Sequence, residues 1–260
     1  MPFTQFLLLK IPTALLGVII VAGAAILSVA TLLTVRRFIP HHRLKAHNDV
    51  AGSIFATLGV LYAVLLAFVV IIVWQGFDNA DLNVQKEANC LTDLYRDAEP
   101  FSLEFRHELY PLLDEYVKTV VNEEWKTMER GEASPHAAEL IRKLWPLYSA
   151  YLPKNATEVA FFQESVRKLN ELGEFRRLRI MDSRSGVNPL LWIVLISGGV
   201  ITVTFISFFG SENLRPQMTM AILLAMLVGL ILFTIAAMDF PFTGSVSVSK
   251  DAFTHIIGYW

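Results

Sequence analysis

The sequence predicts an all-α integral membrane protein, in which four transmembrane helices flank a helical extramembrane domain. Hydrophobic residues make up 54% of the chain and its mean hydropathy is +0.48, values too high for a soluble domain of this size. Charged residues nevertheless make up 18% of the chain, and most of them lie between Gly76 and Val187. The sequence therefore combines apolar segments that suit a lipid bilayer with one polar domain inserted between them.

Four segments have the length and composition of membrane spans, since each offers about 20 apolar residues with few or no charges. They extend from about Ile11 to Val35, Ala51 to Trp74, Pro189 to Phe209 and Met218 to Met238. The first is too long for the core of a secretory signal and ends at Arg36 and Arg37, as a stop-transfer segment does. The predicted parts are a first transmembrane pair (1–75), a helical extramembrane domain (76–187), a second transmembrane pair (188–238) and a C-terminal tail (239–260).

The second span passes without a break into the polar domain. No proline occurs from His47 until Pro100, so the sequence predicts one continuous helix of roughly 50 residues, about 75 Å long. A hydrocarbon core about 30 Å thick accounts for only some 20 of these residues. The remainder must project into water as a rod.

The polar domain is predicted to be helical throughout, with no alternating strand pattern. From Phe101 to about Glu129, apolar residues recur every three or four positions, which is typical of a buried helical stripe. A shorter helix is predicted from Ala137 to Tyr148. A third begins at Asn155, which can form a capping box with Glu158. Asn155 also opens a glycosylation acceptor sequence, but the capping role explains the same residues without a secretory context.

The sequence favours neither enzyme chemistry nor a bound cofactor. The net charge of −2 gives no reason to expect nucleic acid as a partner. The single cysteine, Cys90, excludes an internal disulfide. His41, His42 and His47 lie near Asp49, but no second ligand pair or HExxH spacing accompanies them. We interpret that segment as a solvated loop and expect no metal site.

One face of the second span is polar at both ends and apolar between them. At about 100° per residue, Thr57 and Gln75 share one azimuth, and the apolar residues near it are Leu61, Val64, Phe68 and Ile71. If copies of this helix surround an axis with the face inward, Val64, Phe68 and Ile71 or Ile72 would form an apolar constriction that can gate by dewetting. The alternative is that these side chains contact lipid or neighbouring helices.

A different side of the second span carries a seam of small residues, namely Gly52, Ala56, Gly59 and Ala63. Small residues allow helices to approach closely in lipid. We therefore expect this seam to pack against another helix.

Three arginines near the end of the polar domain, Arg176, Arg177 and Arg179, form a predicted charge cluster at the membrane interface. The expected partners are acids of the rod: Asp78, Asp81, Glu87, Asp93 and Asp97. As exposed ion pairs they would contribute about 0.2 to 1 kcal/mol each, and the alternative is contact with anionic lipid headgroups. Asp239, at the end of the fourth span, either begins a turn or takes part in a subunit contact. Charges on the two sides of the spans are too nearly balanced to set the orientation.

Several motifs, in order along the chain, resemble the bestrophin-like domain family of mostly bacterial membrane proteins. They are His47-Asn48-Asp49-Val50-Ala51-Gly52, Tyr62-Ala63-Val64-Leu65-Leu66-Ala67-Phe68, Glu87-Ala88, Leu94-Tyr95 and Pro241-Phe242-Thr243-Gly244. The resemblance to bestrophins implies a homo-oligomer, with a pentamer favoured, around a central pathway for small inorganic ions. It also implies a bacterial inner membrane location, with the inserted domain and both termini in the cytoplasm.

The resemblance extends to a pore neck but not to a calcium site. The neck is placed on Val64, Phe68 and Ile72, because the four-residue spacing matches. No acidic run resembles the bestrophin calcium clasp, so calcium gating is not expected.

These observations define one leading hypothesis and two rivals. The leading hypothesis is a homo-oligomeric ion channel whose second spans line the pore. The alternative is a non-conducting oligomeric membrane scaffold whose helical domain binds a partner protein. A more distant alternative is a membrane-embedded lipid enzyme that uses His47 and Asp49.

Overall fold

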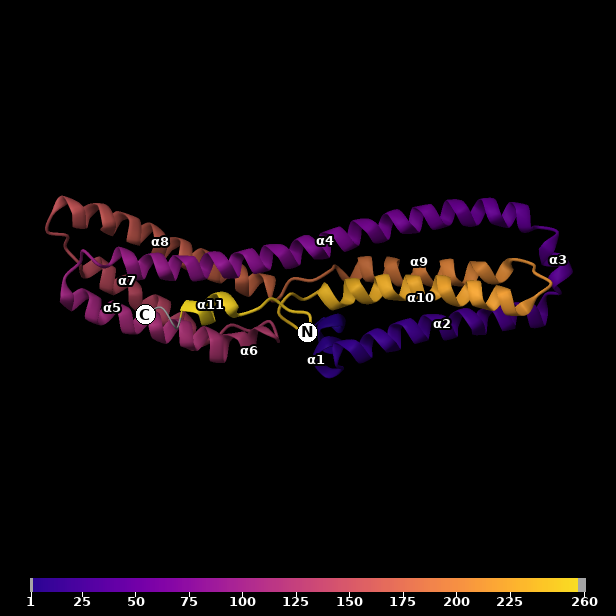
Figure 1. Cartoon of the computed structure of the whole chain (residues 1–260), viewed down its shortest axis with the longest axis horizontal. Coiled ribbons are helices and arrows are strands. Elements are labelled where there is room, and N and C mark those ends of the chain that lie inside the picture. Colours follow the sequence, from indigo (N-terminus) through magenta and orange to yellow (C-terminus); the bar gives the residue numbers. More distant parts are fainter. Residues whose placement is uncertain (1, 257–260) are drawn as a thin grey trace. The chain divides into compact units, whose positions relative to one another are not determined.

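The computed structural model describes residues 2–256, and within them every regular element is a helix. Four helical segments are long and apolar enough to cross a membrane (Figure 1): α2 (Thr13–Phe38), α4 (Asn48–Asp97), α9 (Pro189–Phe205) extended by η2 (Ile206–Phe208), and α10 (Leu214–Met238). The other helices either are short or lie in the chain between α4 and α9. The predicted all-α membrane fold, with a helical domain inserted between the second and third spans, is confirmed.

The chain forms two compact units. The apolar unit comprises residues 2–75 and 186–239, and it contains α1 (Phe3–Lys10), α2, α3 (His41–Lys45), the first part of α4, α9, η2 and α10. The polar unit comprises residues 76–185 and the segment that begins at Phe240. It contains the rest of α4, α5 (Leu103–Thr119), η1 (Val120–Glu124), α6 (Trp125–Met128), α7 (Pro135–Ala150), α8 (Ala156–Asp182) and α11 (Asp251–Ile256).

The long helix α4 runs for 50 residues without interruption. Within the apolar unit its buried side chains are Tyr62, Leu66, Val69 and Val73. Their spacing of four, three and four residues places them on one face of an α-helix. The predicted continuous helix is therefore present, and one row of it packs against the rest of the apolar unit.

The helices of the polar unit begin at capping residues that the sequence already indicates. The Asn155 side chain accepts from the Glu158 backbone N–H at 2.9 Å, and its amide donates to the Glu158 carboxylate at 2.9 Å. Asn155 is therefore the N-cap of α8, as expected, but the Glu158 carboxylate accepts from the Lys154 backbone N–H at 2.9 Å, one residue before the partner that a capping box would use. The stripe predicted from Phe101 to Glu129 forms α5 and α6, joined by the π-helical turn η1, whose last residue, Glu124, is fully buried.

The C-terminal segment is part of the polar unit. Phe242, Val248 and Phe253 are buried in the same apolar core as α5 and α7. The Thr243 hydroxyl donates to the Glu129 carbonyl at 2.9 Å. The segment treated in the sequence as a tail therefore completes this core.

Glycines permit close helix contacts in the apolar unit. A Cβ at Gly229 of α10 would lie 3.1 Å from the Val21 Cα of α2. Two residues after η2 ends, a Cβ at Gly210 would lie 2.1 Å from the Lys45 backbone nitrogen. The Asn48 side chain holds Gly210 by donating to its carbonyl at 2.9 Å and accepting from its N–H at 2.8 Å. Asn48 and Gly210 thus fasten the start of α4 to the end of the third span.

We expect Gly210→Ala to destabilise the protein, because the added methyl group would meet the α3 backbone and force it to shift. Overpacking of this kind costs about 1 to 3 kcal/mol. Thermal unfolding of the detergent-solubilised protein measures the effect. The matched control is Gly23→Ala, since a Cβ at Gly23 meets nothing within 4 Å. Equal melting temperatures for the two variants would contradict this role for Gly210.

Candidate functional site

The face of α4 singled out from the sequence is exposed on the single chain. The exposed fractions are 49% for Val64, 63% for Phe68 and 56% for Ile72. Thr57 and Gln75, at the ends of the face, are also exposed. The structure therefore leaves this row for contact with something outside the chain.

The polar groups on this face are few. The Thr57 hydroxyl donates to the Ser53 carbonyl at 3.1 Å, one turn back along α4. Its hydrogen is therefore used within the helix, as is usual for threonine in spans. Between Thr57 and Gln75 the face offers only apolar side chains, which suits a dry constriction or a lipid contact.

The small-residue seam has no close helix partner within the described part of the chain. A Cβ at Gly52 or Gly59 would meet no atom within 4 Å, and Ala56 and Ala63 are exposed. Gly59 and Ala63 line a groove of about 520 Å³, which α10 borders with Leu224, Leu227, Val228 and Ile231. Contact of the seam with another helix stays a prediction.

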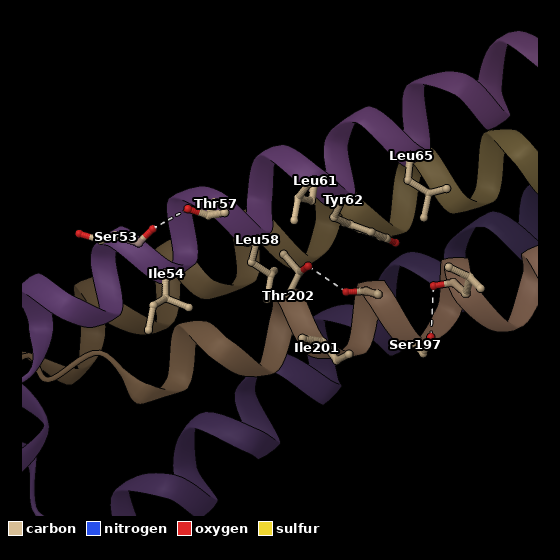
Figure 2. A pocket seen from close by; sticks show the side chains of 12 residues that line it. Ser53, Ile54, Thr57, Leu58, Leu61, Tyr62, Leu65, Ser197, Ile201 and Thr202 are labelled. Atoms are coloured by element: carbon tan, nitrogen blue, oxygen red, sulfur yellow. Dashed lines mark hydrogen bonds between the residues drawn. The ribbon is translucent and has the colours of Figure 1, made fainter.

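A second groove, of about 700 Å³, lies between α4 and α9 and is drawn in Figure 2. Hydroxyl groups line it, but they are already bonded within their own helices. Ser53 donates to the Asp49 carbonyl at 3.1 Å, Ser197 to Ile193 at 2.7 Å and Thr202 to Gly198 at 2.8 Å. Tyr62 differs, because its hydroxyl reaches from α4 to the Leu195 carbonyl of α9 at 2.8 Å.

A buried charged cluster occupies the core of the polar unit. Arg179 of α8 is fully buried. Its Nε and Nη2 donate to the Glu87 carboxylate at 2.6 and 2.9 Å, and Nη2 also donates to Glu124 at 2.7 Å. Arg176 pairs with Glu124, and the Tyr116 hydroxyl donates to Glu87. Two guanidinium groups and two carboxylates therefore balance in charge.

This cluster corrects the prediction of exposed ion pairs. Glu87 is an expected partner of the arginines, but its pair with Arg179 is buried, not exposed. Arg176 pairs with Glu124, which the sequence interpretation missed. The sequence does contain an indication that Glu124 is buried, because it follows Val120 and Val121 at helical spacing and so lies on the same buried stripe. Arg177 alone of the three arginines is exposed.

Aromatic rings cover the buried guanidinium. The Arg179 Cζ lies 5.6 Å from the ring centroids of Trp125 and Phe253. Trp125 and Phe253 are themselves 6.0 Å apart. Because Phe253 belongs to α11, the C-terminal helix shields the cluster from water, which strengthens its ion pairs.

Asp239 connects the ends of two spans within one chain. Its carboxylate accepts from the Val187 backbone N–H at 2.6 Å and from the Trp192 indole at 3.2 Å. The side chain is buried. This contact fastens the start of α9 to the end of α10.

The histidine segment near α3 holds no metal-binding geometry. Among residues 2–256, no three His, Cys, Asp or Glu side chains lie together as ligands for an ion. The Lys45 ammonium instead pairs with Glu212 at 2.7 Å, and both side chains are exposed.

The fold and the exposed face of α4 define a multispan helical membrane protein with an inserted helical unit. A model of the bestrophin-like domain matches residues 22–253, and the chain belongs to that family. Membership of this family supports the assignment of the chain to the class of ion channels.

Solved structures show the same fold. A crystal structure of a bacterial bestrophin homologue from Klebsiella pneumoniae is 11% identical, with a TM-score of 0.68, over 94% of this chain and 96% of that one. Another crystal structure of the Klebsiella homologue is 13% identical, with a TM-score of 0.66, over 94% of both chains. A comparison with curated proteins gave no match.

We expect Arg179→Met to destabilise the protein strongly, because it leaves the Glu87 and Glu124 carboxylates buried with one guanidinium fewer. Breaking a buried pair in this way costs about 3 to 5 kcal/mol. Denaturant unfolding followed by tryptophan fluorescence measures the loss. Arg177→Met, on the exposed side of the same helix, is the control. Adding Glu87→Gln to Arg179→Met should restore part of the stability, and no recovery would argue against an unpaired charge as the cause.

The pKa of the Glu124 carboxyl predicts how stability depends on pH. Burial alone would raise this pKa, but the guanidinium groups of Arg179 and Arg176 outweigh burial and hold it below its ordinary value. Ionised Glu124 therefore stabilises the fold above the unfolded pKa, and this contribution is lost as the pH falls through the folded pKa.

We expect the melting temperature of the wild type to exceed that of Glu124→Gln by a constant amount from about pH 7 to about pH 5.5, and the difference to shrink below about pH 4.3. Thermal unfolding across this range checks the expectation. Glu132→Gln, at an exposed position, serves as the control and should show no such convergence. If the difference in melting temperature widened toward acid pH, the result would contradict the lowered pKa of Glu124.

Proposed function

We propose that the chain is the subunit of a homo-oligomeric ion channel, with α4 of each copy lining a central pathway. The observation that supports this most directly is the exposed row through Val64, Phe68 and Ile72, opposite the buried row of the same helix. Acyl chains can cover an apolar helix face as well as protein can, so the polar residues Thr57 and Gln75 at the two ends of the face are what favour a pathway over lipid. In this proposal the exposed face borders the pathway.

The chemistry of the row suits a neck better than a lipid contact alone. Thr57 and Gln75 place polar groups at its two ends, where an ion pathway would be wet. Val64, Phe68 and Ile72 recur once per turn, so each would contribute one apolar ring in a symmetric assembly. Rings of this kind can close a pore by dewetting without a moving lid.

Neighbouring copies would pack through the small-residue seam. Among residues 2–256, a Cβ at Gly52 or Gly59 would meet nothing within 4 Å, and Ala56 and Ala63 are exposed; small residues allow backbones to approach closely in lipid. Five copies are favoured by the resemblance to bestrophins. The ions conducted would be small and inorganic.

The proposed setting is a bacterial inner membrane, with the polar unit and both termini in the cytoplasm. No catalytic step is assigned to the chain. The rival function is a non-conducting scaffold that presents the polar unit to a partner protein. Exposed apolar side chains of that unit, such as Leu103 and Leu152, would then be contact residues.

We expect purified protein in planar bilayers to pass single-channel currents, and Phe68→Ala to raise the conductance or open probability roughly twofold or more, because it removes the bulkiest side chain of the apolar constriction. Ile26→Ala is the matched control, since Ile26 is an exposed apolar residue of α2. A molecular-mass measurement in detergent should give an oligomer. Intact oligomers that stay silent under every ion gradient would favour the scaffold, and a monomer would end both proposals.

A further inference from the structure

Tyr62 makes an unusually close contact between α4 and α9. A Cβ at Gly198 would lie 2.6 and 2.7 Å from two carbons of the Tyr62 ring, and a Cβ at Gly199 would lie 2.9 Å from its hydroxyl oxygen. The ring therefore rests on a stretch of α9 that has no side chains. In Figure 2 the Tyr62 side chain extends from α4 toward α9. Its hydroxyl donates to the Leu195 carbonyl at 2.8 Å.

The same side chain separates the two grooves beside α4. Tyr62 lines both the groove of about 700 Å³ toward α9 and the groove of about 520 Å³ toward α10. Both grooves open to the outside of the chain. Two turns before Tyr62, Phe55 of α4 stacks on Phe205 of α9 with ring centroids 5.7 Å apart; at the level of Tyr62 the contact between α4 and α9 is its ring against the backbone of Gly198 and Gly199.

We propose, on the basis of the channel function proposed above, that Tyr62 is a positioning residue that sets the width of the ion pathway. The side chain acts as a strut between α4 and α9. Val64 and Phe68 follow it by two and six residues on the same unbroken helix. A change in strut length therefore moves these two neck side chains together with the helix that carries them.

The strut can be shortened or lengthened, and the two changes have opposite expected effects. Tyr62→Ala removes the ring, so that α4 settles toward α9 and away from the axis, and the pathway widens. Gly198→Ala adds a methyl group where the ring now rests, so that α4 moves away from α9 and the pathway narrows. Tyr62→Phe keeps the ring and should conduct like the wild type. General loss of stability does not produce opposite signs.

Single-channel recording in planar bilayers tests the proposal with purified oligomers. We expect conductance to rise roughly twofold in Tyr62→Ala and to fall by a similar factor in Gly198→Ala. The double variant Tyr62→Ala with Gly198→Ala should match Tyr62→Ala alone, because the methyl group then has no ring to meet. This double variant also keeps the test available if Gly198→Ala alone does not assemble. Gly23→Ala is the control for a glycine with open space around it.

A cross-linking measurement tests the strut without relying on conduction. In a Cys90→Ser background, which removes the single native cysteine, cysteines replace Leu58 of α4 and Ile201 of α9, both of which line the groove of Figure 2. Oxidation should link them faster when Tyr62→Ala is added and more slowly when Gly198→Ala is added. Tyr62→Phe should leave the rate unchanged.

The two measurements separate the failure of each proposal. A silent wild type with cross-linking rates that shift in opposite directions would overturn the channel function and support the strut between α4 and α9. A conducting wild type whose Tyr62→Ala and Gly198→Ala variants change in the same direction, or not at all, would overturn the positioning role of Tyr62 and leave the channel function standing.

Discussion

The backbone hydrogen bonding of α4 is the constraint on which the rest of the structure depends. In lipid a helix satisfies its peptide groups within its own segment, and in water a helix gains most of its stability from packing one face against other elements. The unbroken helix from Asn48 to Asp97 meets the first condition by itself, and it also packs along one row in each unit. Tyr62 and Leu66 belong to this row in the apolar unit, and Ala80, Val84 and Leu91 belong to it in the polar unit.

The charged cluster of the polar unit is stable because each buried carboxylate oxygen has a donor. Glu87 accepts from Arg179 and Tyr116, while Glu124 accepts from both arginines and from the Ser134 backbone N–H. Removing two carboxylates from water is costly, and only this complete set of hydrogen bonds offsets the cost. The cluster joins α4, η1 and α8, so its role is to specify how these helices pack, and it adds little net stability beyond that.

Local features were predictable from the sequence, and contacts between distant segments were not. The spans, the continuous α4 and the Asn155 N-cap follow from hydropathy, proline positions and short-range hydrogen bonding. The burial of Arg179 depends on which acids α8 meets, and Glu124 lies 55 residues away in the chain. Tyr62 was noticed only as part of a family motif, because nothing in the sequence shows that Gly198 and Gly199 lie beneath its ring. The exposed row of α4 was identified from the spacing of its apolar residues. That spacing shows which residues share one face of the helix, but it does not show what the face contacts.

Packing in lipid explains why a single aromatic ring can control the position of α4. Apolar burial hardly drives helices together in a bilayer, so shape and hydrogen bonds decide their spacing. Of the hydroxyls lining the groove of Figure 2, only that of Tyr62 crosses to the neighbouring helix. Such a bond contributes about 0.6 kcal/mol on average, too little to hold a helix in place. The steric contact of the ring with Gly198 has no such upper limit, since atoms cannot interpenetrate. In the proposed role of Tyr62, the spacing between α4 and α9 at this level therefore depends on the volume of the ring more than on its hydroxyl.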